Sequence, residues 1–125
     1  MASYQPTVLI IDDQPGIRQM FTMVLSDSGY NVLAAKNGYE GLQLASDNNP
    51  DAILLDFKMP VMDGMEVLKE LTRQSQNHKV IMMTGCGDEG AILAAGARSY
   101  LAKPLDLHQL LKIIEEIVCP LQKSS

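Results

Sequence analysis

Short apolar runs alternate along this chain with stretches of helical spacing, and this alternation constrains the fold more than any other feature. The runs are rich in branched residues and are typical of strands buried on both faces, as in a parallel sheet. They are Val8–Ile11, Tyr30–Ala35, Ala52–Leu55, Val80–Met83 and Ser99–Ala102. Because strands that alternate with helices build right-handed βαβ units, the sequence predicts an α/β fold with a helix-covered parallel sheet.

The intervening segments carry apolar residues at helical spacing. A first helix is expected to begin at Pro15 and to stop at Gly29, with one apolar face made of Ile17, Met20, Phe21, Val24 and Leu25. A weaker pattern predicts a second helix over about Gly38 to Asp47, and a third helix carries Val67, Leu68 and Leu71. The last helix has a clear stripe from Leu107 to Val118, with Asp106 as its N-cap.

Size and charge exclude several classes of protein. The chain has 125 residues, 46% of them apolar, which suits a single domain over 1–125. The net charge of −5 argues against nucleic acid and anionic membrane surfaces as partners. No apolar run approaches the roughly 18 residues of a membrane span, and no secretion signal is evident. We therefore expect a cytoplasmic protein in which Cys86 and Cys119 are reduced thiols.

Polar residues follow the carboxyl ends of four predicted strands. Asp12 and Asp13 follow the first strand, Asp56 the third, Thr84 the fourth and Lys103 the fifth. In an open parallel sheet these ends share one edge, where ligands bind. Three nearby carboxylates repel one another, and a divalent cation such as Mg²⁺ relieves the repulsion. A carboxylate can also attack phosphorus, and a lysine and a hydroxyl can then hold the phosphoryl oxygens.

Each of these residues has a plainer explanation when it is taken alone. Asp12 or Asp13 can cap the first helix, and Asp56 can be a turn residue at a strand end. Thr84 can be an ordinary β-branched strand residue, and Lys103 a solvated lysine. The placement of all five at the same ends of successive strands favours a shared site.

Four motifs, VLIIDDQ, ILLDFKMPVMDG, VIMMTG and SYLAKP, occur in this order. Through them the chain resembles the receiver domains of two-component response regulators, the CheY-like superfamily, over residues 8–118. The sporulation-phosphorelay and chemotaxis receivers are the types that it resembles. The resemblance implies a flavodoxin-like, doubly wound sheet of five parallel strands in the order 2-1-3-4-5, with five helices.

The resemblance also implies roles for the site residues. Asp56 would be the phosphoacceptor, and Lys103 would pair with the phosphoryl group. Asp13, Asp56 and the Lys58 carbonyl would ligate Mg²⁺ directly, whereas Asp12 would act largely through water. The donor would be a histidine kinase or a histidine phosphotransfer protein. The only chemistry expected is self-phosphorylation and slow hydrolysis, and no further cofactor is expected.

The same resemblance implies a conformational switch. Thr84 would move toward a phosphoryl oxygen, and Tyr100 stands where the family has an aromatic ring that then turns inward. Pro104 stands where the family often has a cis peptide, which X–Pro bonds permit. Asp63-Gly64 resembles the family's turn before its third helix. A downstream protein, unknown from the sequence, would sense the change, because we expect no output domain in this chain.

Two enzymatic or carrier functions remain as alternatives on the same fold class. An aspartate-nucleophile phosphatase needs a second acid two residues after the nucleophile, and that position here is Lys58. A flavin carrier needs a phosphate-binding loop after the first strand, where this chain has the acidic pair Asp12-Asp13.

One spacing departs from the family pattern. Only 19 positions separate Thr84 from Lys103, and glycines interrupt this stretch. The sequence therefore predicts a short helix built around Ala91–Ala95, because interior glycines cost about 1 kcal/mol each in a helix. This change is either a harmless deletion or an alteration of the partner surface. Under the second interpretation, dimerisation through this helix fails, and we expect a monomer or a weak dimer.

Several other residues are expected at the rim of the site, under its loops or at the surface. Gln14 and Lys58 are expected at its solvated rim, although Lys58 could also obstruct the water that hydrolyses the phosphoryl group. Met59, Met62 and Met65 are expected to fill gaps under a loop rather than to form a binding surface. His78 and His108 lack the spacing of metal ligands and are expected at the surface.

Overall fold

The structure is a computed structural model that describes residues 5–85 and 89–118. One sheet of five parallel strands has the order β2-β1-β3-β4-β5, which confirms the predicted fold class. In chain order the elements are β1 (Thr7–Ile11), α1 (Pro15–Asp27), β2 (Asn31–Ala35), α2 (Gly38–Asn48), β3 (Ala52–Asp56), α3 (Gly64–Arg73), the 3-10 helix η1 (Asn77–Lys79), β4 (Val80–Thr84), α4 (Glu89–Ala94), β5 (Ser99–Ala102) and α5 (Leu107–Val118). The predictions for Cys86 and Cys119 lie outside the described residues.

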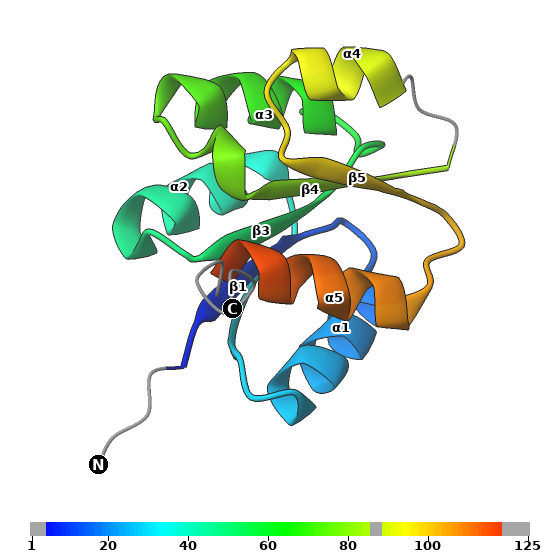
Figure 1. The fold of residues 1–125 in the computed structure, drawn as a ribbon. Coiled ribbons are helices and arrows are strands. Elements are labelled where there is room, and N and C mark those ends of the chain that lie inside the picture. The colour runs from blue at the N-terminus through cyan, green and yellow to red at the C-terminus, as the bar shows by residue number, and fades with distance from the viewer. Residues whose placement is uncertain (1–4, 86–88, 119–125) are drawn as a thin grey trace.

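The sheet lies between two layers of helices (Figure 1). α2, α3 and α4 pack on one face, and α1 and α5 pack on the other. In β1, Leu9 and Ile11 join the core under α2 and α3, whereas Val8 and Ile10 join the core under α1 and α5. Because successive strand residues point to opposite faces, each strand needs apolar residues at every position. This explains the continuous apolar runs.

The two edge strands differ from the prediction that every strand is buried on both faces. β3 and β4 are buried at all positions. In β2, by contrast, Asn31 and Ala34 are exposed, and in β5 only Leu101 is buried. The prediction is wrong for these two strands because an edge strand has a neighbour on one side only.

Helix boundaries follow the signals in the sequence. Pro15 is the first residue of α1, and Gly29 follows the end of this helix with a φ of 97°. Glycine adopts this left-handed conformation without a steric penalty. Asp106 accepts hydrogen bonds from the main-chain N–H groups of His108 and Gln109 at 2.9 and 3.4 Å, which confirms it as the N-cap of α5.

α4 has six residues, as its spacing in the sequence predicts. Side chains from elsewhere hold its C-terminal end. The Thr72 hydroxyl of α3 lies 3.2 Å from the carbonyl oxygen of Ala95, and the Asn77 amide of η1 donates to the carbonyl of Gly96 at 3.0 Å. These contacts tie the two residues that follow α4 to α3 and η1.

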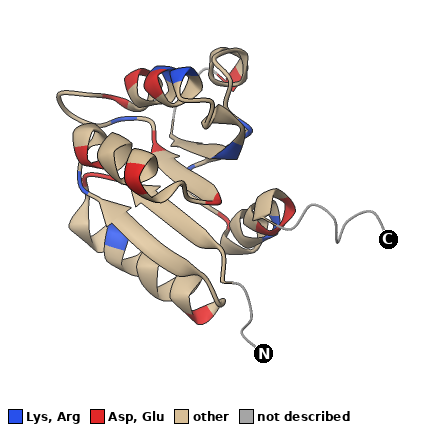
Figure 2. Cartoon of the chain, turned by 90° about the vertical axis from the view of Figure 1, so that its left-hand side faces the viewer, with Lys and Arg blue, Asp and Glu red and all other residues tan. Residues whose placement is uncertain are grey.

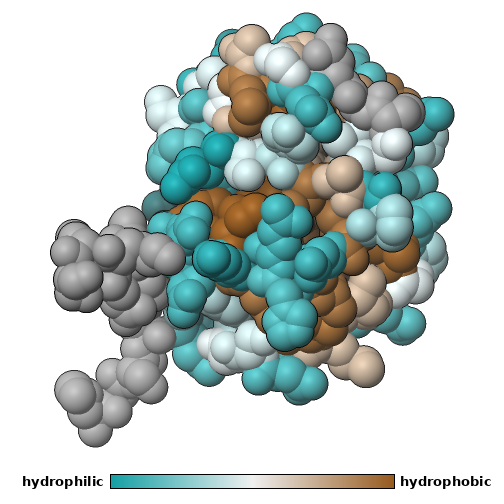
Figure 3. All heavy atoms as spheres, turned by 45° about the vertical axis from the view of Figure 1, so that its right-hand side comes forward, coloured by the Kyte–Doolittle hydropathy of each residue, from teal (hydrophilic) through white to brown (hydrophobic). Residues whose placement is uncertain are grey.

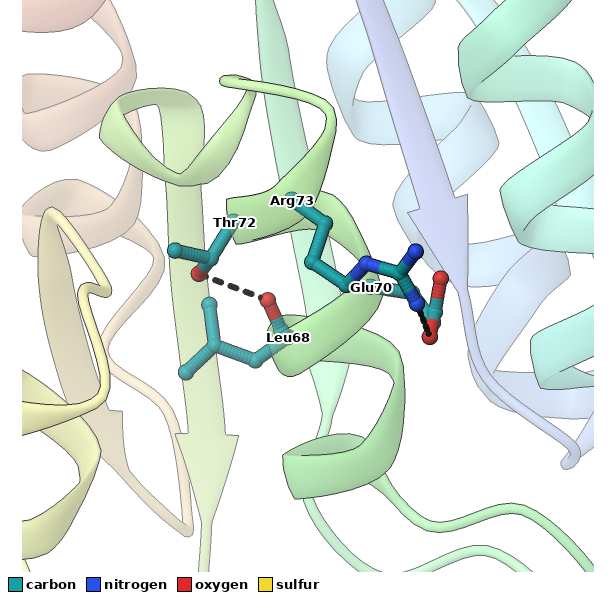
Figure 4. Close-up of polar contacts among 4 residues, drawn as sticks. All are labelled: Leu68, Glu70, Thr72 and Arg73. Carbon is teal, nitrogen blue, oxygen red and sulfur yellow. Dashed lines mark hydrogen bonds and ion pairs between the residues drawn. The ribbon is translucent and has the colours of Figure 1, made fainter.

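The C-terminal turn of α3 combines a part-buried contact and an exposed contact (Figure 4). The Thr72 hydroxyl also donates to the Leu68 carbonyl one turn earlier, at 2.8 Å. On the solvent side, Arg73 pairs with Glu70 at 3.2 Å, and the Arg73 side chain is 77% exposed. An exposed pair of this kind contributes little to stability.

Positive and negative residues are mixed on one side of the molecule. On the face drawn in Figure 2, lysines and arginines stand singly among aspartates and glutamates. Within the described residues, no helix is long and apolar enough to cross a membrane.

Candidate functional site

The strand register brings the predicted site residues to one edge of the sheet. Asp56 pairs with Met83 of β4, so Thr84 extends one residue beyond it on the next strand. Thr84 pairs in turn with Ala102 of β5, so Lys103 extends one residue further. The main-chain N–H of Lys103 donates to the Thr84 carbonyl at 2.8 Å, which joins the ends of these two strands.

Three carboxylates meet at this edge. Asp12, Asp13 and Asp56 each bring an oxygen atom to within 4.8 Å of the other two. Asp12 and Asp56 are buried, and Asp13 is half-buried. Negative charges this close together repel, and burial removes the water that would otherwise screen them.

Asp12 is the most constrained of the three. Its Oδ1 accepts a hydrogen bond from the main-chain N–H of Gln14 at 2.9 Å, while its buried Oδ2 has no hydrogen-bond partner among the described residues. Burial raises the pKa of the Asp12 carboxyl, the Gln14 N–H opposes the rise, and the Asp56 carboxylate adds to it. Gln14, not Asp12 or Asp13, is the N-cap of α1, so the plainer explanation of this acidic pair is wrong.

Lys103 supplies the positive charge of the site. Its Nζ lies 2.8 Å from Oδ1 of Asp56, whose side chain is 4% exposed. The Lys103–Pro104 peptide is cis, as predicted. Asp56 is the last residue of β3 and is buried in an ion pair, so it is not an ordinary exposed turn residue. Thr84 is buried at the end of β4.

Comparison with known proteins decides the family. Residues 8–115 match the family model of the response regulator receiver domain. The chain belongs to this family. Receiver domains are the phosphoacceptor modules of two-component signalling, so the predicted function class is confirmed.

Individual relatives agree with this assignment. The receiver is 39% identical to the sporulation initiation phosphotransferase F of Bacillus subtilis, over 82% of this chain and 86% of that protein. It is 34% identical to the chemotaxis protein CheY of Listeria monocytogenes, over 87% of this chain and 95% of that protein. Other curated relatives are longer, and the receiver spans 24% or 46% of their length.

A solved structure bears on the metal. The receiver domain of the sensor histidine kinase PA1611 from Pseudomonas aeruginosa, described with a magnesium ion coordinated in its active site cleft, has a TM-score of 0.82 and 28% identity. That match covers 92% of this chain and 98% of the other. In the present receiver, a buried carboxylate oxygen without a partner and two adjacent carboxylates are the hard oxygen ligands that suit Mg²⁺.

The rim of the site agrees with the minor predictions. Gln14 and Lys58 are exposed. Met59 is buried, and Met62 and Met65 pack against the core beneath the loop between β3 and α3, which confirms their gap-filling role. His78 and His108 are exposed, and neither belongs to a group of metal-ligating residues in the described part of the receiver.

Two side chains near the site escaped the sequence analysis. Glu89, the first residue of α4, forms a hydrogen bond with the phenol of Tyr100, and this contact raises the pKa of the phenol. Arg18 donates from Nη1 to the main-chain carbonyl of Asp12 at 2.8 Å. One signal pointed to Arg18, because it is the only charged residue of α1 before Asp27.

Proposed function

We propose that Asp56 is the residue on which this receiver accepts its phosphoryl group. The observation that carries the proposal is the 2.8 Å ion pair between the buried Asp56 carboxylate and Lys103. A carboxylate in this position has a cation ready to neutralise an arriving phosphoryl oxygen. The neighbouring acidic residues add a site for a divalent cation.

In the proposed step, an Asp56 oxygen attacks the phosphorus atom of a phosphohistidine. A new O–P bond forms while the P–N bond breaks, and the bonding electron pair leaves with the imidazole. Lys103 and the Thr84 hydroxyl hold the phosphoryl oxygens. With acetyl phosphate as donor, the bond that breaks is a P–O bond and the electron pair leaves with acetate.

Bound Mg²⁺ supplies positive charge against the carboxylates and the phosphoryl oxygens. We propose that Asp13, Asp56 and the Lys58 carbonyl ligate it directly and that Asp12 acts largely through water. The buried Oδ2 of Asp12 has no hydrogen-bond partner among the described residues, which supports this proposal, because a buried carboxylate oxygen is costly without a partner. Self-phosphorylation and hydrolysis are then the only reactions of the chain.

The output is a shift between two arrangements. The phosphoryl group draws in Thr84, and the ring of Tyr100 moves into the space that Thr84 leaves. Thr84 is buried at the site edge, and Tyr100 is half-buried on the adjacent strand, which supports their coupling. A downstream protein would read the surface formed by α4, β5 and α5.

The phosphodonor docks, in this proposal, on an apolar groove beside the site. The groove has a volume of about 330 Å³ and lies between α1 and the segment that joins β5 to α5, with Ile17, Met20, Phe21, Met83, Pro104, Leu105 and Leu107 in its walls and Gln14 and Lys103 at its polar end. Figure 3 turns this side of the molecule forward and shows apolar surface between polar side chains. A helix of a histidine kinase or phosphotransfer protein fits such a groove. The receiver would act as a single cytoplasmic domain.

Asp56→Asn tests the phosphoacceptor. The variant and the wild type are incubated with acetyl phosphate and Mg²⁺, and the intact mass is measured. We expect the wild type to gain the mass of one phosphoryl group and Asp56→Asn to gain none. Asp47→Asn is the matched control, because Asp47 is exposed on α2 and its substitution removes the same charge. Stable phosphorylation of Asp56→Asn would disprove the assignment.

Met20→Glu tests the groove. Met20 is 37% exposed in the groove wall, whereas Met23, 66% exposed, faces a different hollow of α1 and serves as the control. Phosphotransfer from a panel of histidine kinases should slow for Met20→Glu and not for Met23→Glu, with the acetyl phosphate reaction unchanged in both. Equal slowing by both variants would argue against this docking site.

Lys58→Ala tests the proposed obstruction of the attacking water. The Lys58 side chain is exposed two residues after Asp56, and the substitution keeps the main-chain carbonyl that is proposed to bind Mg²⁺. Dephosphorylation should be faster in the variant, and an unchanged rate would remove this role.

A further inference from the structure

The bond between Arg18 and the main chain of Asp12 has a consequence for the cation site. We infer that Arg18 is a positioning residue, which fixes the peptide between Asp12 and Asp13 so that both carboxylates face Asp56 before a cation binds. This inference rests on the proposed Mg²⁺ site and assigns a role to a residue outside its ligands.

The contacts of Asp12 show how its main chain is held. Its N–H still belongs to the sheet, because it donates to the Ala35 carbonyl of β2 at 3.1 Å. Its carbonyl instead accepts from Nη1 of Arg18 at 2.8 Å. Its side chain is tied to the N–H of Gln14. The chain therefore leaves the sheet at Asp12, and Arg18 holds the first peptide group after that point.

The geometry of a strand explains why this peptide matters. Successive residues of a strand point to opposite faces of the sheet. Asp12 and Asp13 are adjacent, yet both bring an oxygen to within 4.8 Å of Asp56, so the backbone must turn between them. The orientation of the Asp12 carbonyl sets the plane of that turn, and hence the direction in which the Asp13 side chain leaves the backbone.

Electrostatics make a fixed turn necessary. Without a cation, the three carboxylates repel, and the half-buried Asp13 is the one with room to move away. A peptide held by a charge-assisted hydrogen bond resists this movement. Because the site is then already assembled, binding the cation requires less ordering of the chain.

The inference concerns geometry, not the charge of Arg18. Within the described residues, its guanidinium donates to a main-chain oxygen rather than to a carboxylate. A lysine at position 18 can donate one hydrogen bond to the same oxygen. A methionine keeps the apolar stem but leaves the carbonyl to water. These two substitutions separate the hydrogen bond from the packing of the side chain.

The test measures Mg²⁺ binding directly. The full chain is titrated with Mg²⁺ alone, and the affinity is read from the amide NMR signals near the acidic cluster. We expect Arg18→Met to weaken Mg²⁺ binding about tenfold, the usual size of an effect from residues that orient metal ligands. Arg18→Lys should restore most of the affinity. Arg73→Met, which removes an equal charge from an exposed side chain, should leave the affinity within twofold of the wild type.

Unfolding by urea in the presence of EDTA provides the second readout. If Arg18→Met lowers the free energy of unfolding but binds Mg²⁺ like the wild type, Arg18 merely joins α1 to β1 and the inference is wrong. Equal weakening by Arg73→Met would also overturn it, because the loss of affinity would then not depend on the hydrogen bond to Asp12. Should Arg18→Met fail to fold, Arg18→Gln takes its place, because the glutamine side chain is two bonds shorter than that of arginine and its amide cannot reach the Asp12 carbonyl oxygen.

The proposed cation site can fail separately. If Mg²⁺ shifts no signals near the acidic cluster of the wild type, the site itself is absent and both proposals fall. If the wild type binds Mg²⁺ but the Mg²⁺ affinities of the Arg18 variants differ from those expected, the cation site is supported and the positioning role of Arg18 is wrong.

Discussion

Asp12→Asn replaces a buried carboxylate by a neutral group of nearly the same shape, and we expect it to stabilise the metal-free protein. Two unit charges 4.8 Å apart repel by about 3.5 kcal/mol at an effective dielectric constant of 20, and the carboxylate oxygens of the cluster lie no further apart than this, so each pair repels at least this strongly before Lys103 is counted. The unpartnered Oδ2 adds a desolvation cost of about 1–3 kcal/mol. Because Lys103 offsets part of the repulsion, we expect a net gain of about 1–3 kcal/mol in the free energy of unfolding.

The pH dependence of this gain follows from the pKa of Asp12. Burial raises the pKa of its carboxyl above the ordinary value of 3.8, so the folded protein binds this proton more tightly than the unfolded chain. Such a group favours folding below its unfolded pKa, and the contribution is lost as the pH rises through the folded pKa. The advantage of Asp12→Asn over the wild type should therefore be largest at neutral pH and should shrink as the pH approaches 3.8.

Urea unfolding in EDTA measures both effects, with Asp47→Asn as the exposed control. In a second series, rising Mg²⁺ concentration should reduce the difference in the free energy of unfolding between Asp12→Asn and the wild type. A ligand at ten times its Kd stabilises the wild type by about 1.4 kcal/mol. The variant, which lacks one of the carboxylates, should gain less. The reasoning would be refuted if Asp12→Asn were no more stable than the wild type in EDTA, or if their difference did not change with pH.

Three further substitutions test the architecture around the site by urea unfolding. Gly64→Ala should lower the free energy of unfolding by more than about 2 kcal/mol, because the new Cβ would lie 2.6 Å from the Asp56 carbonyl oxygen. Gly16→Ala is the control, and it should be neutral or stabilising because nothing lies within 4 Å of its new Cβ. Val61→Asn should stabilise by about 0.5–1 kcal/mol, because Val61 is exposed with a φ of 69°, a conformation that suits asparagine better than a β-branched residue; a loss of stability would contradict this. Asn77→Ala should cost about 1 kcal/mol by removing a hydrogen bond to the C-terminal end of α4, and an unchanged midpoint would show that water replaces it.

The sheet and the residues of the site could be predicted because short stretches of sequence are enough to indicate both. Continuous branched runs indicate doubly covered strands, and a polar residue at the end of such a run must lie at the carboxyl edge of the sheet. The position of a strand within the sheet is not a local property. The apolar pattern alone therefore did not show that β2 is an edge strand, half-open to solvent, and the order of the strands came only from the resemblance to receiver domains.

Contacts between elements were also beyond local reasoning. The bond from Arg18 to Asp12 depends on how α1 leaves β1, and the bond between Glu89 and Tyr100 depends on where α4 lies against β5. Such pairs form between side chains of many possible partners, and no spacing rule selects them. Nor could the sequence show which oxygen of Asp12 is left without a partner, since that follows from the orientation of the Gln14 N–H.

Because α4 is short, β5 is the main structural connection between the site and the proposed partner surface of α4, β5 and α5. α4 contributes one buried side chain, Ile92, to the core, and Leu93 beside it is 44% exposed. β5 by contrast carries Tyr100, pairs with the end of β4 at Thr84, and leads directly into Lys103. If Asp56 is phosphorylated as proposed, the added charge would act on β5 through Thr84 and Lys103, and on α4 through the contact between Tyr100 and Glu89. Under the proposed function, we expect a partner that senses phosphorylation on this face to depend more on β5 and α5 than on the six-residue α4.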